Sequence, residues 1–249
     1  LPHEASAAPG HPSRHIAGSS GSTGAAQRLW RMARPVAGSL AETYLRGRGI
    51  VDLQNADPLR FLPDCYWRPE GGGATETWPA LIAAVTDLEG TVTGAHRTWL
   101  ARDGRQKAPL DPPRKAMGVL LGHGVRFGRA QDVLAAGEGI ETVLSLRQVL
   151  PGLPMVAALS AGHLAALLFP AQLRRLYIVC DNDPAGRIAR EALVARASEA
   201  GVEALVLSPM LGDFNDDLVA RGQDALRAWV RPQLAPEDVS RFMGPMQAP

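Results

Sequence analysis

Cysteine and lysine are both scarce in this 249-residue chain, which contains two of each. The cysteines, Cys65 and Cys180, lie far apart and outside any Cys-x-x-Cys or Cys/His cluster, which argues against a disulfide scaffold or a zinc module in this chain. No apolar run approaches the roughly 20 residues of a membrane span, and no secretory leader opens the sequence. The protein is therefore expected in the reducing cytoplasm without a membrane partner. The first residue, Leu1, fits either a fragment or an unusual start codon.

Positive charge gathers in one stretch, although the formal net charge is only +1. Residues 97–129, the basic strip, contain eight basic residues against Asp103 and Asp111, an excess of six positive charges, and both lysines of the chain. Such a stretch is either a solvated loop or a surface for a polyanion. Its basic residues are Arg97, Arg102, Arg105, Lys107, Arg114, Lys115, Arg126 and Arg129.

The first half of the chain reads as a tail followed by a small α+β subdomain. Residues 1–27 are rich in Gly, Ser, Ala and Pro without apolar periodicity, which predicts a disordered tail. Residues 28–130 form the predicted subdomain, in which "WPALIAAVTD" and "TVTGAHRTWL" are expected to pair as a hairpin. The proline-rich segment 101–118 that follows is predicted to lack regular structure.

The second half alternates short apolar runs with helical stretches. Strands are predicted at 132–136, 155–159, 176–180 and 203–207, with helices between them, a spacing typical of successive βαβ units. Residues 131–222 are therefore predicted to be an α/β domain, a parallel sheet flanked by helices. A short helix and a loose tail are expected over 223–249.

Acidic residues follow three of the four predicted strands. Glu138 comes after the first, Asp181 and Asp183 after the third, and Asp213 and Asp216 after the fourth. Ligands of such sheets gather at the carboxyl ends of the strands. Converging carboxylates repel one another unless a cation lies between them, and their oxygens suit Mg²⁺. The pattern indicates a metal-dependent phosphoryl-transfer site.

Each acidic residue also has a structural interpretation. Asp183 precedes Pro184 and, taken alone, is better explained as a helix N-cap. Glu141 lies in the first turn of a predicted helix, where a carboxylate interacts favourably with the helix dipole, and is interpreted as structural. The combination of three strand ends favours the metal site.

This combination resembles the Toprim domain. In that domain a Glu follows the first strand, an Asp-x-Asp pair follows the third strand, and an acidic patch follows the fourth. The resemblance covers about residues 131–222 and implies a centre for Mg²⁺ or Mn²⁺. It implies that Glu138 is the catalytic glutamate and that Asp181 and Asp183 are metal ligands. Asp213 and Asp216 would belong to the acidic patch.

The segments "AETYLRGRGI", "DLEGTVTGAHRTWL" and "RKAMG" look like those that precede the Toprim domain in bacterial DNA primases. By this resemblance the polymerase core spans residues 28–222, and Arg97, Lys107, Arg114 and Lys115 contact nucleic acid or nucleotide. Two departures are Asn182, where replicative primases usually have Gly, and the fourth-strand patch, which reads D-F-N-D instead of D-P-D-E.

Neither a zinc-binding module nor a helicase P-loop is found in the sequence. The chain therefore resembles the primase-like proteins of plasmids, phages and integrative elements. The leading hypothesis is a DNA primase-like nucleotidyltransferase that makes short RNA primers on single-stranded DNA. A helicase or a separate zinc-binding module would be its partner. A Toprim nuclease and a catalytically silent nucleic-acid-binding adaptor are the alternatives.

Overall fold

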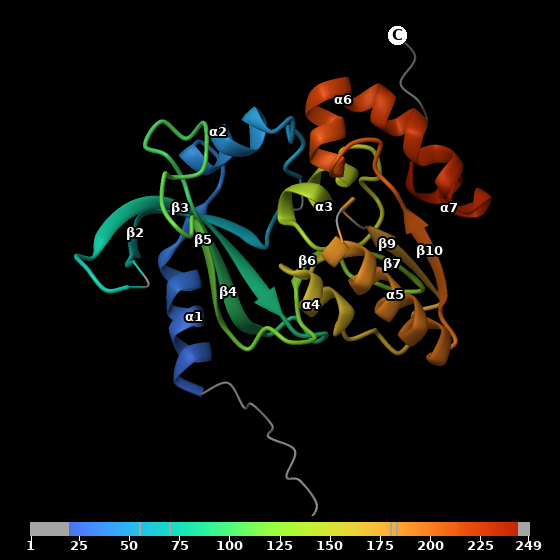
Figure 1. Cartoon of the computed structure of the whole chain (residues 1–249), viewed down its shortest axis with the longest axis horizontal. Coiled ribbons are helices and arrows are strands. Elements are labelled where there is room, and N and C mark those ends of the chain that lie inside the picture. Colours follow the sequence, from blue (N-terminus) through green and yellow to red (C-terminus); the bar gives the residue numbers. More distant parts are fainter. Residues whose placement is uncertain (1–19, 55, 70, 180, 183, 244–249) are drawn as a thin grey trace, which may run out of the picture.

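The computed structural model describes residues 20–54, 56–69, 71–179, 181–182 and 184–243. Two five-stranded sheets and the helices around them make up these residues (Figure 1). The helices are α1 (Ser20–Met32), α2 (Leu40–Gly47), α3 (Ile140–Arg147), α4 (Ala161–Ala165), α5 (Pro184–Glu199), α6 (Phe214–Val230), the 3₁₀ helix η1 (Arg231–Gln233) and α7 (Pro236–Phe242). The strands are β1 (Arg34–Pro35), β2 (Leu59–Trp67), β3 (Glu76–Thr86), β4 (Val92–Trp99), β5 (Arg114–Gly118), β6 (Val125–Phe127), β7 (Val133–Gly137), β8 (Met155–Ala157), β9 (Arg175–Val179) and β10 (Glu203–Leu207).

The N-terminal sheet has the order β1-β2-β3-β4-β5 and is antiparallel throughout. The predicted hairpin is confirmed as β3 and β4, which are joined by a turn where the Asp87 carboxylate accepts hydrogen bonds from the Glu89 and Thr91 N–H groups. The prediction of an irregular segment 101–118 was wrong at its end, because β5 pairs with β4 there. All three prolines of the segment precede β5, so none of them removes a donor from the ladder.

Helix α1 corrects the predicted tail. It begins at Ser20, inside the segment 1–27, while residues 1–19 lie outside the described residues. Ala26 is fully buried in a cluster with Ala95 and Trp99 of β4, and the Gln27 side chain donates to the Val92 carbonyl. The helix is therefore held by tertiary contacts with the sheet, which the small and polar residues 20–27 do not reveal.

The C-terminal sheet has the order β10-β9-β7-β8-β6, and the four predicted strands are confirmed as its parallel members β7, β8, β9 and β10. The short strand β6 adds an antiparallel edge. Alternate residues of each strand face opposite sides: Leu134 and Ile178 pack in the cluster that contains α4 and α5, whereas Ala135 and Tyr177 pack with α3 and α6. Helices thus cover both faces, as predicted.

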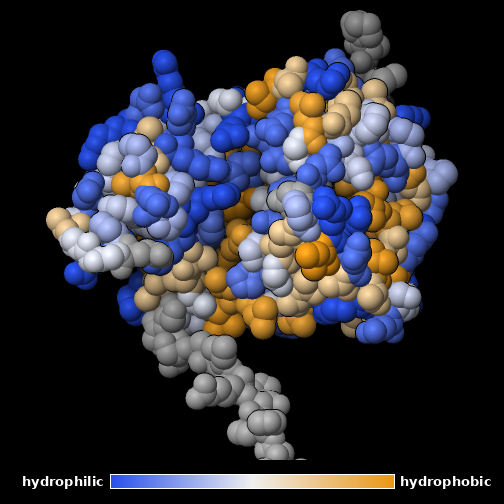
Figure 2. Space-filling model, viewed as in Figure 1, coloured by the Kyte–Doolittle hydropathy of each residue, from blue (hydrophilic) through white to orange (hydrophobic). Residues whose placement is uncertain are grey.

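One hydrophobic cluster joins the two halves of the molecule. It includes Tyr44 of α2 and Leu81 of β3 together with Val143 of α3 and Leu218 of α6. The halves therefore share a packed core, and the surface is hollowed where they meet (Figure 2). Among the described residues, no helix is long and apolar enough to span a bilayer.

Candidate functional site

Three of the predicted acidic residues line one cavity of about 220 Å³ at the carboxyl ends of the C-terminal strands. Glu138 follows β7, Asp181 follows β9, and Asp213 is the N-cap of α6 after β10. Because β7, β9 and β10 are parallel neighbours, their carboxyl ends meet at the same edge of the sheet. Of the other two predicted acidic residues, Asp183 lies outside the described residues and Asp216 does not line this cavity.

Asn182 connects the two loops that carry Asp181 and Asp213. Its backbone N–H donates to the Gly212 carbonyl at 2.9 Å, and its side-chain amide donates to the Leu211 carbonyl at 2.7 Å. A glycine at this position has no side chain to make the second bond. The departure from the primase pattern therefore adds a link between the loops of the site.

The three aspartates after β10, Asp213, Asp216 and Asp217, lie in different environments. Asp213 accepts the Asp216 N–H at 2.8 Å, and the fully buried Asp217 accepts the N–H groups of Met210 and Leu211. Asp216 is exposed and lines a separate hollow with residues such as Val219. The structure thus brings Asp213 to the cavity but not Asp216, which was predicted as a further ligand.

The N-terminal half contributes cations to the lining of the same cavity, namely Arg48, Lys107 and Arg114. Arg48 follows α2 and is held by the buried Asn215, whose side-chain oxygen accepts from the Arg48 guanidinium at 3.1 Å and whose nitrogen donates to the Arg48 carbonyl at 2.8 Å. Neither Arg48 nor Asn215 was among the predicted site residues, because Arg48 lies outside the basic strip and Asn215 is not one of the acidic residues that the sequence pattern indicates.

Strand alternation separates the four predicted basic residues. His96 of β4 lines the cavity, so the adjacent Arg97 lies on the opposite face, where its guanidinium stacks 5.0 Å from the Trp99 ring centre. Lys115 is directly across from Arg97 and shares that face, whereas Arg114 lines the cavity. Lys107 and Arg114 therefore reach the site, and Arg97 and Lys115 do not.

His96 is nine-tenths buried, and its Nδ1 atom has no hydrogen-bond partner among the described residues. Burial lowers its pKa to about 4, assisted by the positive charges of Arg114, Arg97 and Lys107, although Glu141 acts in the opposite direction. The imidazole in the cavity is consequently neutral at physiological pH.

This burial makes folding stability depend on pH. Between pH 6.5 and about 4 the unfolded chain protonates His96 while the folded chain does not, so stability should fall as the pH falls through that range. The loss should approach roughly 3 kcal/mol. We expect the free energy of unfolding, measured by denaturant titration, to depend less on pH for His96→Gln than for wild type. Parallel curves for the two proteins would contradict a neutral His96.

The donor chemistry of the cavity fits a divalent cation. Carboxylate oxygens are preferred ligands of Mg²⁺ and Mn²⁺, and Glu138, Asp181 and Asp213 supply three such groups. Within the described part of the chain, no three His, Cys, Asp or Glu side chains are grouped closely enough to hold an ion. A complete ligand set would therefore have to draw on Asp183, on water or on substrate oxygens.

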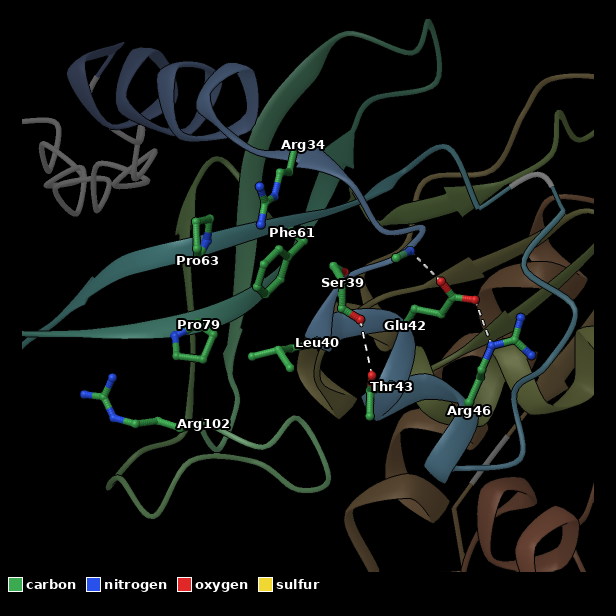
Figure 3. Close-up of a pocket in the computed structure, with 11 residues that line it drawn as sticks. Arg34, Ser39, Leu40, Glu42, Thr43, Arg46, Phe61, Pro63, Pro79 and Arg102 are labelled. Carbon is green, nitrogen blue, oxygen red and sulfur yellow. Dashed lines mark hydrogen bonds and ion pairs between the residues drawn. The ribbon is translucent and has the colours of Figure 1, made fainter.

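A second cavity, of about 580 Å³, lies on the N-terminal half between α2 and the sheet (Figure 3). Phe61, Pro63 and Pro79 line it, with Arg34 and Arg102 beside them. The one carboxylate among its lining residues belongs to Glu42, which pairs with Arg46 at 2.8 Å and accepts the Gly38 N–H. This cavity therefore lacks the acidic cluster that phosphoryl transfer requires.

Two family profiles match the chain. The family described as Toprim domain matches residues 133–224, and one described as a domain of unknown function (DUF7146) matches residues 20–127. A comparison with curated proteins gives no match.

Several solved structures have the same fold. The chain is similar to the zinc-binding and RNA polymerase domains of Aquifex aeolicus primase, with a TM-score of 0.58, 18% identity, and coverage of 84% of this chain and 60% of that one. It is similar to a DNA primase domain from Pseudomonas aeruginosa, with a TM-score of 0.54, 18% identity and coverage of 84% and 77%. The RNA polymerase domain of Mycobacterium tuberculosis primase DnaG, in complex with double-stranded DNA, gives a TM-score of 0.51, 20% identity and coverage of 84% and 78%. The chain therefore contains a Toprim domain at residues 133–224 and resembles the polymerase core of bacterial DNA primases.

Proposed function

We propose that this protein is a primase-like nucleotidyltransferase that joins ribonucleotides into short primers on single-stranded DNA. The observation that carries the proposal is the composition of one cavity, which is lined both by carboxylates at the strand ends of the Toprim domain and by cations from the N-terminal half. Carboxylates suit divalent metal, and guanidinium and ammonium groups suit phosphates. This is the combination that phosphoryl transfer between nucleotides requires.

The chain's own residues would divide the work as follows. Glu138 would accept the proton of the attacking hydroxyl, and Arg48, Lys107 and Arg114 would hold the phosphates of the nucleotide. Asp181 and Asp213, with Asp183 from outside the described residues, would hold Mg²⁺ or Mn²⁺. When bound, the cation would neutralise phosphoryl charge and orient the attacking oxygen.

The N-terminal half favours polymerisation over the cleavage reaction of Toprim nucleases. It supplies cations to the lining of the cavity, and it belongs to the part of the chain that shares its fold with primase polymerase domains. DNA is proposed as the template because the mycobacterial relative was solved in complex with DNA. The Aquifex structure also contains a zinc-binding domain, so we propose that a separate module of that kind, or a helicase, assists here.

The test is incubation of the purified protein with single-stranded DNA, labelled ribonucleotides and Mg²⁺ or Mn²⁺, with products separated by length. New oligonucleotides that depend on template would support the proposal. Shortened DNA would replace it with the nuclease. If neither product forms, calorimetric titration with Mg²⁺ of wild type and Asp181→Asn would identify an adaptor, for which both proteins should give the same signal.

A further inference from the structure

Glu141 is more than a favourable charge at the start of α3. Its carboxylate oxygen Oε1 accepts the Tyr44 hydroxyl at 2.7 Å and lies 3.3 Å from the Lys107 ammonium nitrogen. Both partners come from the N-terminal half, and Tyr44 is fully buried. The side chains of Glu141 and Lys107 are only 13% and 25% exposed, so the contact is largely shielded from solvent.

The pair is ionic. Burial opposes ionisation of Glu141, but Lys107, the Tyr44 hydroxyl, the helix backbone and Arg114 outweigh it and lower the pKa of Glu141 to about 2. His96 lies in the same cavity and is neutral, so it does not compete for the carboxylate as a cation. Arg114 is exposed. Lys107 is therefore the main ionic partner of Glu141.

The ammonium group of Lys107 can bind a ligand in addition to Glu141. Lys107 belongs to the loop between β4 and β5 and pairs with Leu100 in an antiparallel bridge, whose hydrogen bonds are donated by the N–H groups of the next residues, Ala101 and Ala108. An ammonium group has three N–H donors, and the contact with Glu141 needs one of them. Lys107 and Glu141 both line the cavity that contains Glu138. Among the described residues, Glu141 is the one side chain paired with this ammonium group, so its other N–H groups are left for a ligand beside the acidic centre.

We infer that Glu141 is a positioning residue, which holds the Lys107 ammonium at the cavity wall where it binds the phosphates of the incoming nucleotide. The inference rests on the proposed function and adds a residue that the sequence analysis interpreted as structural. A long lysine side chain loses much conformational freedom on binding, and fixing it beforehand reduces that cost.

The direction in which Glu141→Gln changes nucleotide affinity distinguishes a positioning role of Glu141 from a purely electrostatic effect of its charge. Replacing Glu141 by Gln makes the cavity more positive, which by itself should strengthen the binding of an anion. If Glu141 instead acts by holding Lys107, the same replacement should weaken binding. The two explanations therefore predict opposite changes in the dissociation constant.

The experiment measures binding of a fluorescent ribonucleoside triphosphate, by anisotropy in Mg²⁺, to wild type, Glu141→Gln, Lys107→Met and the double variant. We expect Lys107→Met to weaken binding about tenfold and Glu141→Gln to weaken it about three- to tenfold, with the double variant no weaker than Lys107→Met. In primer synthesis KM should rise by the same factors, with kcat within about twofold. Glu42→Gln, which breaks the Glu42–Arg46 pair outside the cavity, is the matched control and should bind like wild type.

Tighter or unchanged binding by Glu141→Gln would overturn the inference, as would additive losses in the double variant or no nucleotide binding by wild type. If Glu141→Gln does not fold, Glu141→Asp tests the same contact, because it keeps the charge but shortens the reach to Lys107. Nucleotide binding with the expected pattern but without primer synthesis would contradict the proposed function alone.

Discussion

Glu138→Gln is expected to reduce primer synthesis by about a thousandfold, the scale of a lost general base. Glutamine has nearly the same shape as glutamate but cannot accept the proton of the attacking hydroxyl at neutral pH. Glu138 lines the cavity directly after β7, so the substitution changes the charge of the acidic centre without changing the strand that supports it. The measurement is the initial rate of primer formation at saturating nucleotide.

The matched control is Glu199→Gln, the same change on the exposed end of α5. It should leave the rate unchanged. Glu138→Gln should also retain the melting temperature of wild type and its affinity for single-stranded DNA, since the DNA-binding groups are cationic. A Glu138→Gln protein with more than about a tenth of the wild-type rate would exclude Glu138 as the catalytic base.

Arg175→Met is expected to cause a large loss of stability. Arg175 of β9 forms three contacts of 2.7 Å, with Glu203, Glu237 and Asp238. The Asp238 side chain is only 2% exposed and also accepts the Tyr177 hydroxyl, so it would be left as a buried charge without its cation. Loss of one partner of a buried pair costs about 3–5 kcal/mol.

The loss should appear as a decrease in melting temperature of roughly 6–20 °C, given about 2–4 °C per kcal/mol for a chain of this size. Arg241→Met is the matched control, because its pair with Asp132 is 43% and 48% exposed, and it should cost less than about 1 kcal/mol. Arg175 begins the strand whose other end carries the site, so nucleotide binding by Arg175→Met should be unchanged at temperatures where it is folded. Equal effects of the two substitutions would contradict the argument from burial.

Local sequence patterns were sufficient for the parallel strands of the C-terminal domain but not for its last helices. The prediction of a short helix and a loose tail over 223–249 was wrong, because α6 begins at Phe214 and α7 follows it, with Phe242 and Met243 buried in the core. The apolar runs at 132–136 and 203–207 are bounded by turns and separated by helical stretches, an alternation typical of a parallel sheet whose strands are buried on both faces. Parallel strands share the direction of their carboxyl ends, so the convergence of Glu138, Asp181 and Asp213 followed from the order of the elements alone.

Patterns were insufficient where contacts between distant segments decide the structure. Helix α1 begins at Ser20 because Ala26 packs against β4, about 70 residues further along the chain. The strand β5 exists because β4 provides a ladder for it. The beginning of α1 was assigned to the tail because residues 20–27 are small and polar, and β5 has no apolar alternation of its own, so neither could be placed from local sequence. The predicted domain boundary at residue 130 stays a prediction.

The sequence by itself determined the type of site: an acidic centre at the strand ends of a Toprim domain, and a strip of basic residues upstream. Only the tertiary structure decided which of these residues meet. Alternation along β4 turns His96 toward the cavity and Arg97 away from it, and the register of β5 does the same for Arg114 and Lys115. The contact of Glu141 with Tyr44 and Lys107 likewise depends on how α3 packs against the N-terminal half. Charge and residue type are properties of the sequence, whereas the face on which a side chain lies is set by strand register and by packing between the halves.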